Sequence, residues 1–230
     1  MTTPEWLGWH FLSADRKITA YNSTTPHSGV LVVPGQTLAL TGRPIPCVWG
    51  LHASKRPIDA LQYAPGPIVQ YVRLSGSIVE RADKACATER TCLWVMDASL
   101  ALHICAVNFA QIALDAQLAD GKKIDPRSQA ALDVKLRWLK GQASDSEMAA
   151  VQAAARAAAE AWGAGYAEEA AAQAAAAALE AASAATAAAK AAAWAPSWVA
   201  SRAAVWDLQN QILEVALLTQ HETGRGVFVN

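Results

Sequence analysis

The sequence predicts an α+β protein in which a small, mostly antiparallel β-rich domain (residues 1–95) precedes an α-helical domain (residues 96–230). Two observations lead to this prediction. Short β-branched and aromatic segments recur between turns that contain Gly or Pro up to Val95, a pattern typical of antiparallel strands. Beyond that point apolar residues recur every three or four positions, and residues 148–195 are overwhelmingly alanine, the residue with the highest helix propensity.

The strands of the first domain follow from residue type and turn signals. Residues 9–12 predict a strand that returns through a polar turn to residues 18–21 as a hairpin. After a loop rich in Ser, Thr and Pro, residues 30–33 and 38–40 predict two short strands. Residues 68–79 and 91–95 predict the last two, and Gly76 indicates a bulge or bend.

Residues 50–66 predict a turn, a short helix and a helix breaker in succession. Pro57 suits the first turn of a helix, and Pro65-Gly66 ends it before the next strand. Because so short a helix needs one large anchor, we expect Tyr63 to be buried against that strand.

The second domain should consist of several helices. Asp125-Pro126 is an N-cap followed by proline at the first helical position, and Ser144 with Glu147 forms a capping box. The alanine-rich run is predicted to be helical, and whether it breaks at Gly163 and Gly165 stays open. The last helix should have a broad apolar face. Its central residues are Trp198, Val205, Leu208, Ile212 and Val215, and the residues that widen the face are Trp206, Leu213 and Leu217.

Composition limits the possible functions. With 53% apolar residues and a net charge of −1 the chain can build a core, and its charge does not favour nucleic acid as a partner. No basic and apolar leader begins the sequence, and charged residues interrupt the alanine-rich run, so we expect a cytoplasmic protein that no helix anchors in a membrane. The four cysteines lack metal-binding spacing, so we expect buried thiols and no metal site: Cys47, Cys86, Cys92 and Cys105.

Four residues of the predicted turn form a candidate binding surface: His52, Ser54, Lys55 and Arg56. A turn histidine commonly hydrogen-bonds the backbone, and a ligand or acid–base role is the alternative. His10 should point to the face opposite Trp9 and Phe11, where it is either a satisfied buried group or part of a cleft.

The order of His10, Ser54, Tyr63 and a late Glu80 or Glu89 is similar to that of ADP-ribosyltransferase folds. In those enzymes a histidine holds the nicotinamide ribose, an aromatic residue stacks on the ring and a glutamate polarises the acceptor or the ribose hydroxyl. This similarity implies His10, Tyr63 and Glu89 as catalytic candidates and NAD as the cofactor. The spacing is short, and no HExxH, GxSxG or phosphate-binding loop occurs, so the enzyme is the alternative hypothesis.

Five segments together resemble a family of bacteriophage and prophage proteins: residues 9–12, 50–66, 74–76, Asp83-Lys84, and Arg90 with Trp94. The alanine-rich, tryptophan-punctuated tail is similar to the tail that often accompanies that domain. The family has no established activity, so the resemblance implies phage origin and assigns no catalytic residue or cofactor.

These observations favour a phage accessory protein that acts without a cofactor, through contact with a host protein in the bacterial cytoplasm, for example by inhibiting a defence protein. Its binding residues would be the four turn residues together with Trp198 and Trp206. Large apolar residues of the C-terminal helices also predict a homodimer. The alternatives are the ADP-ribosyltransferase-like enzyme and a structural component of the virion.

Overall fold

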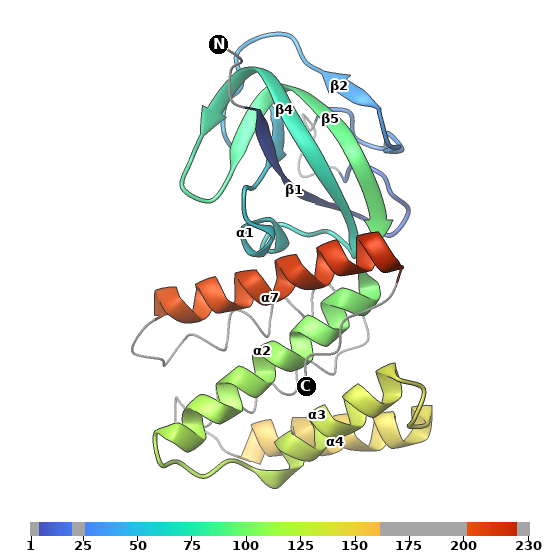
Figure 1. The fold of residues 1–230 in the computed structure, drawn as a ribbon, viewed down its shortest axis with the longest axis vertical. Coiled ribbons are helices and arrows are strands. Elements are labelled where there is room, and N and C mark those ends of the chain that lie inside the picture. The colour runs from blue at the N-terminus through green and yellow to red at the C-terminus, as the bar shows by residue number, and fades with distance from the viewer. Residues whose placement is uncertain (1–4, 20–25, 162–201, 225–230) are drawn as a thin grey trace. The chain divides into compact units, whose positions relative to one another are not determined.

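The computed structural model describes residues 5–19, 26–161 and 202–224, and it divides into two compact units on either side of the Ala98–Ser99 bond. The first unit is an antiparallel β-sheet with one short helix, and the second is helical (Figure 1). The α+β class predicted from the sequence is therefore confirmed.

The sheet of the first unit has five strands: β1 (Trp6–Leu12), β2 (Thr37–Ala39), β3 (Leu51–Ala53), β4 (Ile68–Glu80) and β5 (Ala85–Asp97). Their spatial order is β1-β4-β5-β2, and β3 pairs with a different stretch of β5. All of these pairings are antiparallel. The long β4–β5 hairpin therefore forms the centre of the sheet, and the shorter strands lie beside it.

The partner of β1 differs from the prediction. β1 pairs with β4 along its full length, from Trp6 opposite Leu74 to Leu12 opposite Ile68, and residues 18–19 do not form a hairpin with it. Residues 30–33 also form no strand, since Leu31 makes only an isolated bridge with Lys17. The alternation of residue types indicates strands but not their partners, and pairing with β4 buries most of β1.

The bulge predicted at Gly76 is confirmed. The register of β4 and β5 shifts between Ser75 and Ile78, and Gly76 has a φ of 73°. A second shift lies between Tyr71 and Val72. Bulges of this kind bend the strand and change which side chains face one side of the sheet.

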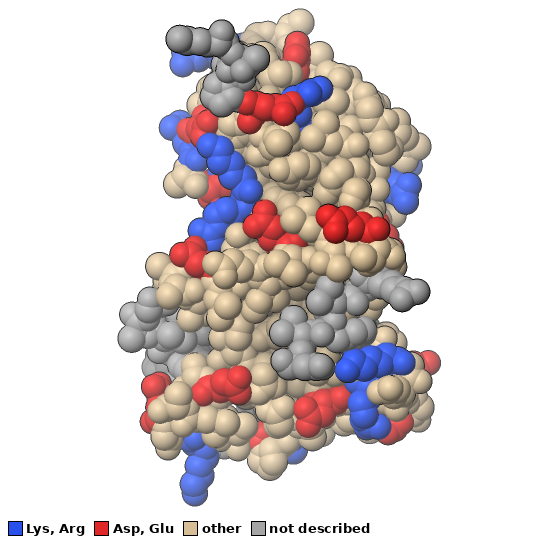
Figure 2. Space-filling model, in the orientation of Figure 1, with Lys and Arg blue, Asp and Glu red and all other residues tan. Residues whose placement is uncertain are grey.

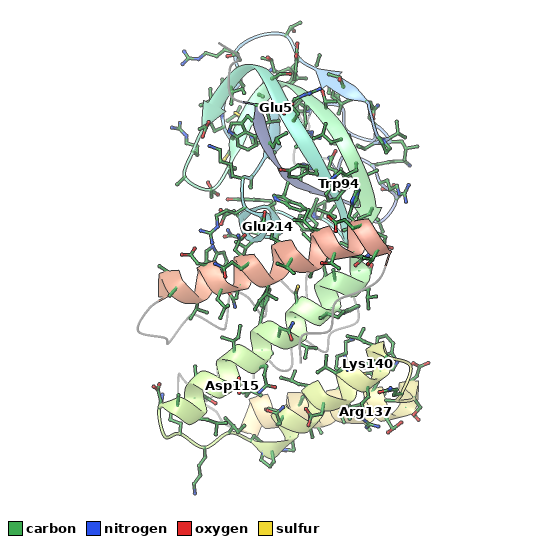
Figure 3. All side chains as sticks on the ribbon, viewed as in Figure 1. Glu5, Trp94, Asp115, Arg137, Lys140 and Glu214 are labelled. Atoms are coloured by element: carbon green, nitrogen blue, oxygen red, sulfur yellow. The ribbon has the colours of Figure 1, made fainter. Side chains whose placement is uncertain are left out.

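Residues alternate between the two faces of the sheet. One face carries two clusters of buried side chains, the first around Leu12, Leu38 and Cys92 and the second around Val72 and Leu74. On the other face Trp9 contacts Tyr71 and Trp94, with ring centroids 4.9 and 5.7 Å away, and Figure 3 labels Trp94 on β5. His10 follows Trp9 in β1 and therefore points to the opposite face.

The short helix α1 (Pro57–Leu61) begins with proline, as predicted, but Tyr63 does not anchor it. Ile58 and Leu61 are 1% and 2% exposed, whereas Tyr63 is 54% exposed. Residues three apart share one face of a helix, so Ile58 and Leu61 fill the core together. Tyr63 lies beyond the last helical residue, and the prediction that it is buried is wrong.

The second unit contains α2 (Ser99–Ala119), α3 (Pro126–Leu139), α4 (Asp145–Ala161) and α7 (Arg202–Thr223). The Asp125 side chain caps α3 by accepting a hydrogen bond from the Arg127 amide. The predicted capping box is also present, since the Glu147 amide donates to Ser144 Oγ and the Ser144 amide to Glu147 Oε2. Arg137, labelled near the end of α3 in Figure 3, lies 3.4 Å from Glu147.

The buried face of α7 differs from the predicted one. Leu213, Ala216 and Leu217 are buried, whereas Leu208 and Val215 are 45% and 56% exposed. Gln209 is also buried, although it is polar. Gly163, Gly165 and Trp198 lie outside the described residues.

Among the described helices α2 is long and apolar enough to cross a membrane by length and composition, and 56% of its most apolar window is buried in the protein. It is in contact with both α3 and α7. A central helix of a water-soluble bundle has the same properties, and the structure is compatible with such a protein.

Candidate ligand-binding pocket

A pocket of about 280 Å³ lies in the first unit, between β1, β3, the loop before β3 and the segment that follows α1. Six polar or charged side chains are prominent among those that line it: His10, His52, Ser54, Tyr63, Lys84 and Arg90. The rest of the described lining is largely apolar and includes Trp9, Phe11, Ile18, Val48, Leu51 and Pro65.

A close approach of the backbone brings β1 beside the end of β3. The amide of Trp9 donates to the Ser54 carbonyl at 2.7 Å, and the Ser54 amide donates to the Trp9 carbonyl at 3.0 Å. Gly8 permits this approach, because a Cβ there would lie 2.6 Å from the Ser54 oxygen. The two-way pairing brings the strand that carries His10 next to the turn that follows His52.

His10 is held by a neighbouring strand. It lies opposite Gln70 of β4, and its Nδ1 is 3.0 Å from Gln70 Nε2, so in this arrangement the amide donates to the ring. Gln70 is only 1% exposed. The other ring nitrogen, Nε2, has no hydrogen-bond partner among the described residues and can carry the proton.

His52 is held through both its ring and its backbone. The Cys47 amide donates to His52 Nε2 at 3.1 Å, so this nitrogen carries no proton, and the His52 carbonyl accepts a hydrogen bond from Arg90 at 2.8 Å. Cys47 itself is exposed, which corrects the expectation that all four thiols are buried. It occupies a left-handed turn with a φ of 64° just before β3, so its side chain stays outside the core.

Arg90 is a buried cation on β5. It is 3% exposed and lies opposite Leu38 on one side and Leu74 on the other. No carboxylate of the described residues forms an ion pair with it, and burial lowers the pKa of its guanidinium to about 10. The group remains charged at neutral pH.

The two histidines of the pocket are neutral at pH 7. Burial lowers the pKa of His52 to about 4, and the charges of Arg90 and Lys84 add to this effect. Burial also lowers the pKa of His10 well below its ordinary value, with contributions from Arg90 and His52. A buried imidazole beside a fixed cation avoids a second positive charge.

Lys84 and Tyr63 form a second polar group at the pocket. Lys84 Nζ lies 3.9 Å from the centroid of the Tyr63 ring, and the Tyr63 hydroxyl donates to the Asp83 carboxylate. This hydrogen bond lowers the pKa of Asp83 and raises that of Tyr63. Asp83 itself does not line the pocket, and its carboxylate accepts the hydrogen bond from Tyr63 outside it.

The structure brings together four of the predicted site residues, namely His10, His52, Ser54 and Tyr63. Glu89 is exposed on β5 and accepts a hydrogen bond from Ser75, so it does not reach them.

The other predicted binding residues that the structure describes lie outside the pocket. Lys55 pairs with Glu80 at 2.9 Å, and Arg56 lies 3.8 Å from Asp59 beside α1. Trp206 is half-buried on α7 in the second unit, and Trp198 lies outside the described residues.

Sequence reasoning did not single out Arg90 and Lys84 as pocket residues. It began the last strand at residue 91, whereas β5 begins at Ala85. A longer strand would have placed Arg90 in line with Cys86, four residues earlier and therefore on the same face. The four-residue spacing of Cys86 and Arg90 was visible in the sequence. The register shifts between β4 and β5, however, mean that alternation alone does not assign each residue of this strand to a face.

Comparisons with protein-family models, curated proteins and solved structures gave no match for this chain. Among the described residues no group of three or more His, Cys, Asp or Glu side chains could hold a metal ion.

The charged side chains among the described lining residues of the pocket are cations. Arg90 and Lys84 are cationic, and one nitrogen of each histidine is already committed to a partner within the protein. No carboxylate lies among the described lining residues. The arrangement is therefore better suited to holding a ligand than to relaying a proton, because general acid–base catalysis needs a group that can both gain and lose a proton near neutral pH.

Proposed function

We propose that this protein is a phage accessory protein that binds a host protein in the bacterial cytoplasm, without catalysing a reaction, and that the pocket of the first unit is its recognition element. The observation that supports this best is the pocket itself, which combines apolar walls with fixed donors and lacks a carboxylate among its described lining. A concave apolar site with a few fixed polar groups is typical of specific binding. The resemblance of residues 50–66 to phage proteins favours a host partner.

The face of the described residues that Figure 2 presents is less suited to recognition by charge. Figure 2 shows Lys and Arg side chains interspersed with Asp and Glu side chains on the face of each unit that it presents. Several charged side chains of the described part are paired with one another, for example Arg73 with Glu5 at 2.7 Å. The unpaired Arg90 therefore makes the pocket the more distinctive surface.

A matched pair of substitutions tests this function. Val48 lines the pocket and is 57% exposed, and Leu31 is 50% exposed and does not line it. The tagged protein should capture a host protein from bacterial lysate, identified by mass spectrometry. Val48→Arg should lose that protein and Leu31→Arg should retain it. Retention of the same protein by both variants would show that the pocket is not the contact surface.

The ADP-ribosyltransferase-like enzyme is the second candidate, because His10, Ser54 and Tyr63 do gather in one pocket. The position of Glu89 weighs against it, since this carboxylate is exposed and bound by Ser75. Incubation with labelled NAD and host lysate separates the two functions. Transfer of the label that is lost in His10→Ala and in Glu89→Ala would establish the enzyme and overturn the binding function.

A further inference from the structure

Arg90 carries a charge that the protein itself leaves largely uncompensated. The guanidinium has five N–H donors, and the acceptor that the described residues give it is the His52 carbonyl at 2.8 Å. Removing a cation from water without a counter-charge is unfavourable by several kcal/mol, so buried arginines are normally paired. The side chain also lines a pocket, where a ligand can reach it.

Two further groups around the pocket favour negative charge. Lys84 lies over the Tyr63 ring and forms no ion pair with a described carboxylate, and His10 Nε2 has no described partner. Both histidines are neutral, so His10 can donate through Nε2 without adding to the charge that Arg90 already supplies. A buried cation, a partly buried cation and a neutral N–H donor together form a set that suits an oxyanion.

The apolar walls define the rest of the ligand. For comparison, an apolar cavity of about 150 Å³ in another protein is large enough to bind benzene. The volume here is about 280 Å³, enough for a body of that size together with a charged group. Ile18, Val48 and Leu51 are among the apolar residues that line it. A bare inorganic ion would leave those walls without a partner.

We propose that the pocket binds an oxyanion, a carboxylate or a phosphate, attached to an apolar body, with Arg90 as its anchor and Lys84 as a second cation. The inference rests on the proposed function, since it names the chemical group that the same pocket recognises on its partner. The planar guanidinium can donate two parallel hydrogen bonds to either oxyanion, which fixes the orientation of the ligand. The low dielectric of the pocket strengthens this interaction relative to one on the surface.

Isothermal titration calorimetry on the whole chain tests the proposal at neutral pH and constant ionic strength. Phenylacetate and phenyl phosphate are the ligands, and they distinguish the two oxyanions. Benzyl alcohol, acetate and inorganic phosphate are controls that lack either the charge or the apolar body. At least one of the two ligands should bind saturably, and each control should bind about tenfold more weakly or worse. Absence of saturable binding by both ligands, or equal binding by benzyl alcohol, would overturn the proposal.

Substitutions test which cationic side chains of the pocket bind the oxyanion. Arg90→Gln should weaken binding of the preferred ligand at least about tenfold, and Lys84→Gln should weaken it about threefold to tenfold. Arg73→Gln removes a cation of the same unit that does not line the pocket, and it should leave binding unchanged. If Arg90→Gln does not fold by circular dichroism, Lys84→Gln decides, because Lys84 is only partly buried. Unchanged affinity in a folded Lys84→Gln would then overturn the assignment.

The outcome is distinguishable from that of the proposed function. If the lysate experiment identifies a host protein that Val48→Arg loses, while neither phenyl ligand binds, this inference fails and the proposed function stands. If the ligands bind through Arg90 but no host protein is captured, the oxyanion site stands and the host-protein function fails.

Discussion

Single side chains around the pocket are fixed by partners within the protein. Gln70 orients His10, and the Cys47 amide orients His52, while the carbonyl of His52 holds Arg90. Each contact fixes a donor or an acceptor before a ligand arrives, which reduces the conformational entropy lost on binding. The pocket is therefore pre-organised at its polar side.

At the residue scale, the exposure of Tyr63 predicts a small effect on stability. Tyr63→Ala removes the hydrogen bond to Asp83 and the contact with Lys84, and it should reduce the free energy of unfolding by about 1 kcal/mol. Leu61→Ala, two residues earlier, empties a fully buried position and should cost about 2–5 kcal/mol. Urea denaturation measures both, and an equal loss in the two variants would contradict this assignment of the α1 anchor.

The lowered pKa of His52 predicts a dependence of stability on pH. The unfolded histidine takes up a proton near pH 6.5, and the folded one only near pH 4. Between these values the unfolded state binds more protons, so stability is complete above this window and falls as the pH is lowered through it. The loss assigned to His52 should be on the order of 2–3 kcal/mol. His10 should add to it in the same direction.

Urea denaturation at several pH values across this window measures the effect. His52→Gln keeps an acceptor for the Cys47 amide but cannot be protonated, so it should make the pH dependence shallower and leave the part due to His10 and His103. A variant that loses stability with pH as steeply as the parent would show that His52 is not the group responsible.

At the scale of the elements, the bulge of the β4–β5 hairpin has no room for a side chain at Gly76. A Cβ at Gly76 would collide with Thr88 Oγ1, which accepts a hydrogen bond from the Ser77 amide at 3.0 Å, so moving that hydroxyl would lose the bond. Gly35 also has a positive φ, of 80°, but an added Cβ would meet nothing within 4 Å. The two positions therefore separate backbone strain from steric collision.

Gly35→Ala should cost about 1–2 kcal/mol, the price of a left-handed conformation for a residue with a Cβ. Gly76→Ala should cost about 1–2 kcal/mol more, because the collision with Thr88 adds to the same strain. Thermal unfolding followed by circular dichroism compares the two variants. Equal losses would mean that the hairpin can relax around the added methyl group.

At the scale of the whole molecule, the first unit contains what it needs to fold alone. It has a complete sheet and two buried clusters, and the Ala98 amide donates to the Pro67 carbonyl at 3.0 Å, within the same unit. A fragment of residues 1–98 should therefore unfold cooperatively in urea and retain β-rich circular dichroism. A fragment without a cooperative transition would contradict the division into two independent units.

The homodimer predicted from the sequence now depends on other residues of α7. Leu213 is buried within the chain and is not available to a second subunit. Leu208, Val215 and Leu218 are 45%, 56% and 39% exposed, and their spacing forms an apolar stripe on one side of the helix. Large exposed apolar residues on one stripe favour a contact with a second copy.

Light scattering at micromolar concentration should therefore give the mass of a dimer. The double variant Leu208→Lys, Val215→Lys should be monomeric, because it places charges in the contact. Ala203→Lys adds a charge to α7 away from the stripe and should remain dimeric. A monomer mass for the parent protein would remove the prediction.

Features that depend on neighbouring residues could be predicted from the amino-acid sequence alone. It predicted the α+β class, the N-caps at Asp125 and Ser144, the start of α1 at Pro57 and the bulge at Gly76. These features arise from local backbone preferences and from hydrogen bonds between residues a few positions apart, so the residue types at those positions are sufficient. His10, His52, Ser54 and Tyr63 were also recognised as candidates, although only as separate positions.

Contacts between segments that are distant in the sequence could not be predicted in this way. β1 pairs with β4 across about sixty residues rather than with the segment that follows it, because the long-range register buries most of its side chains. That pairing, together with the Trp9–Ser54 bridge, gathers His10, His52 and Arg90 in one pocket and leaves Glu89 outside it. No local preference specifies such contacts, since their free energy comes from burial that exists only after the chain has folded.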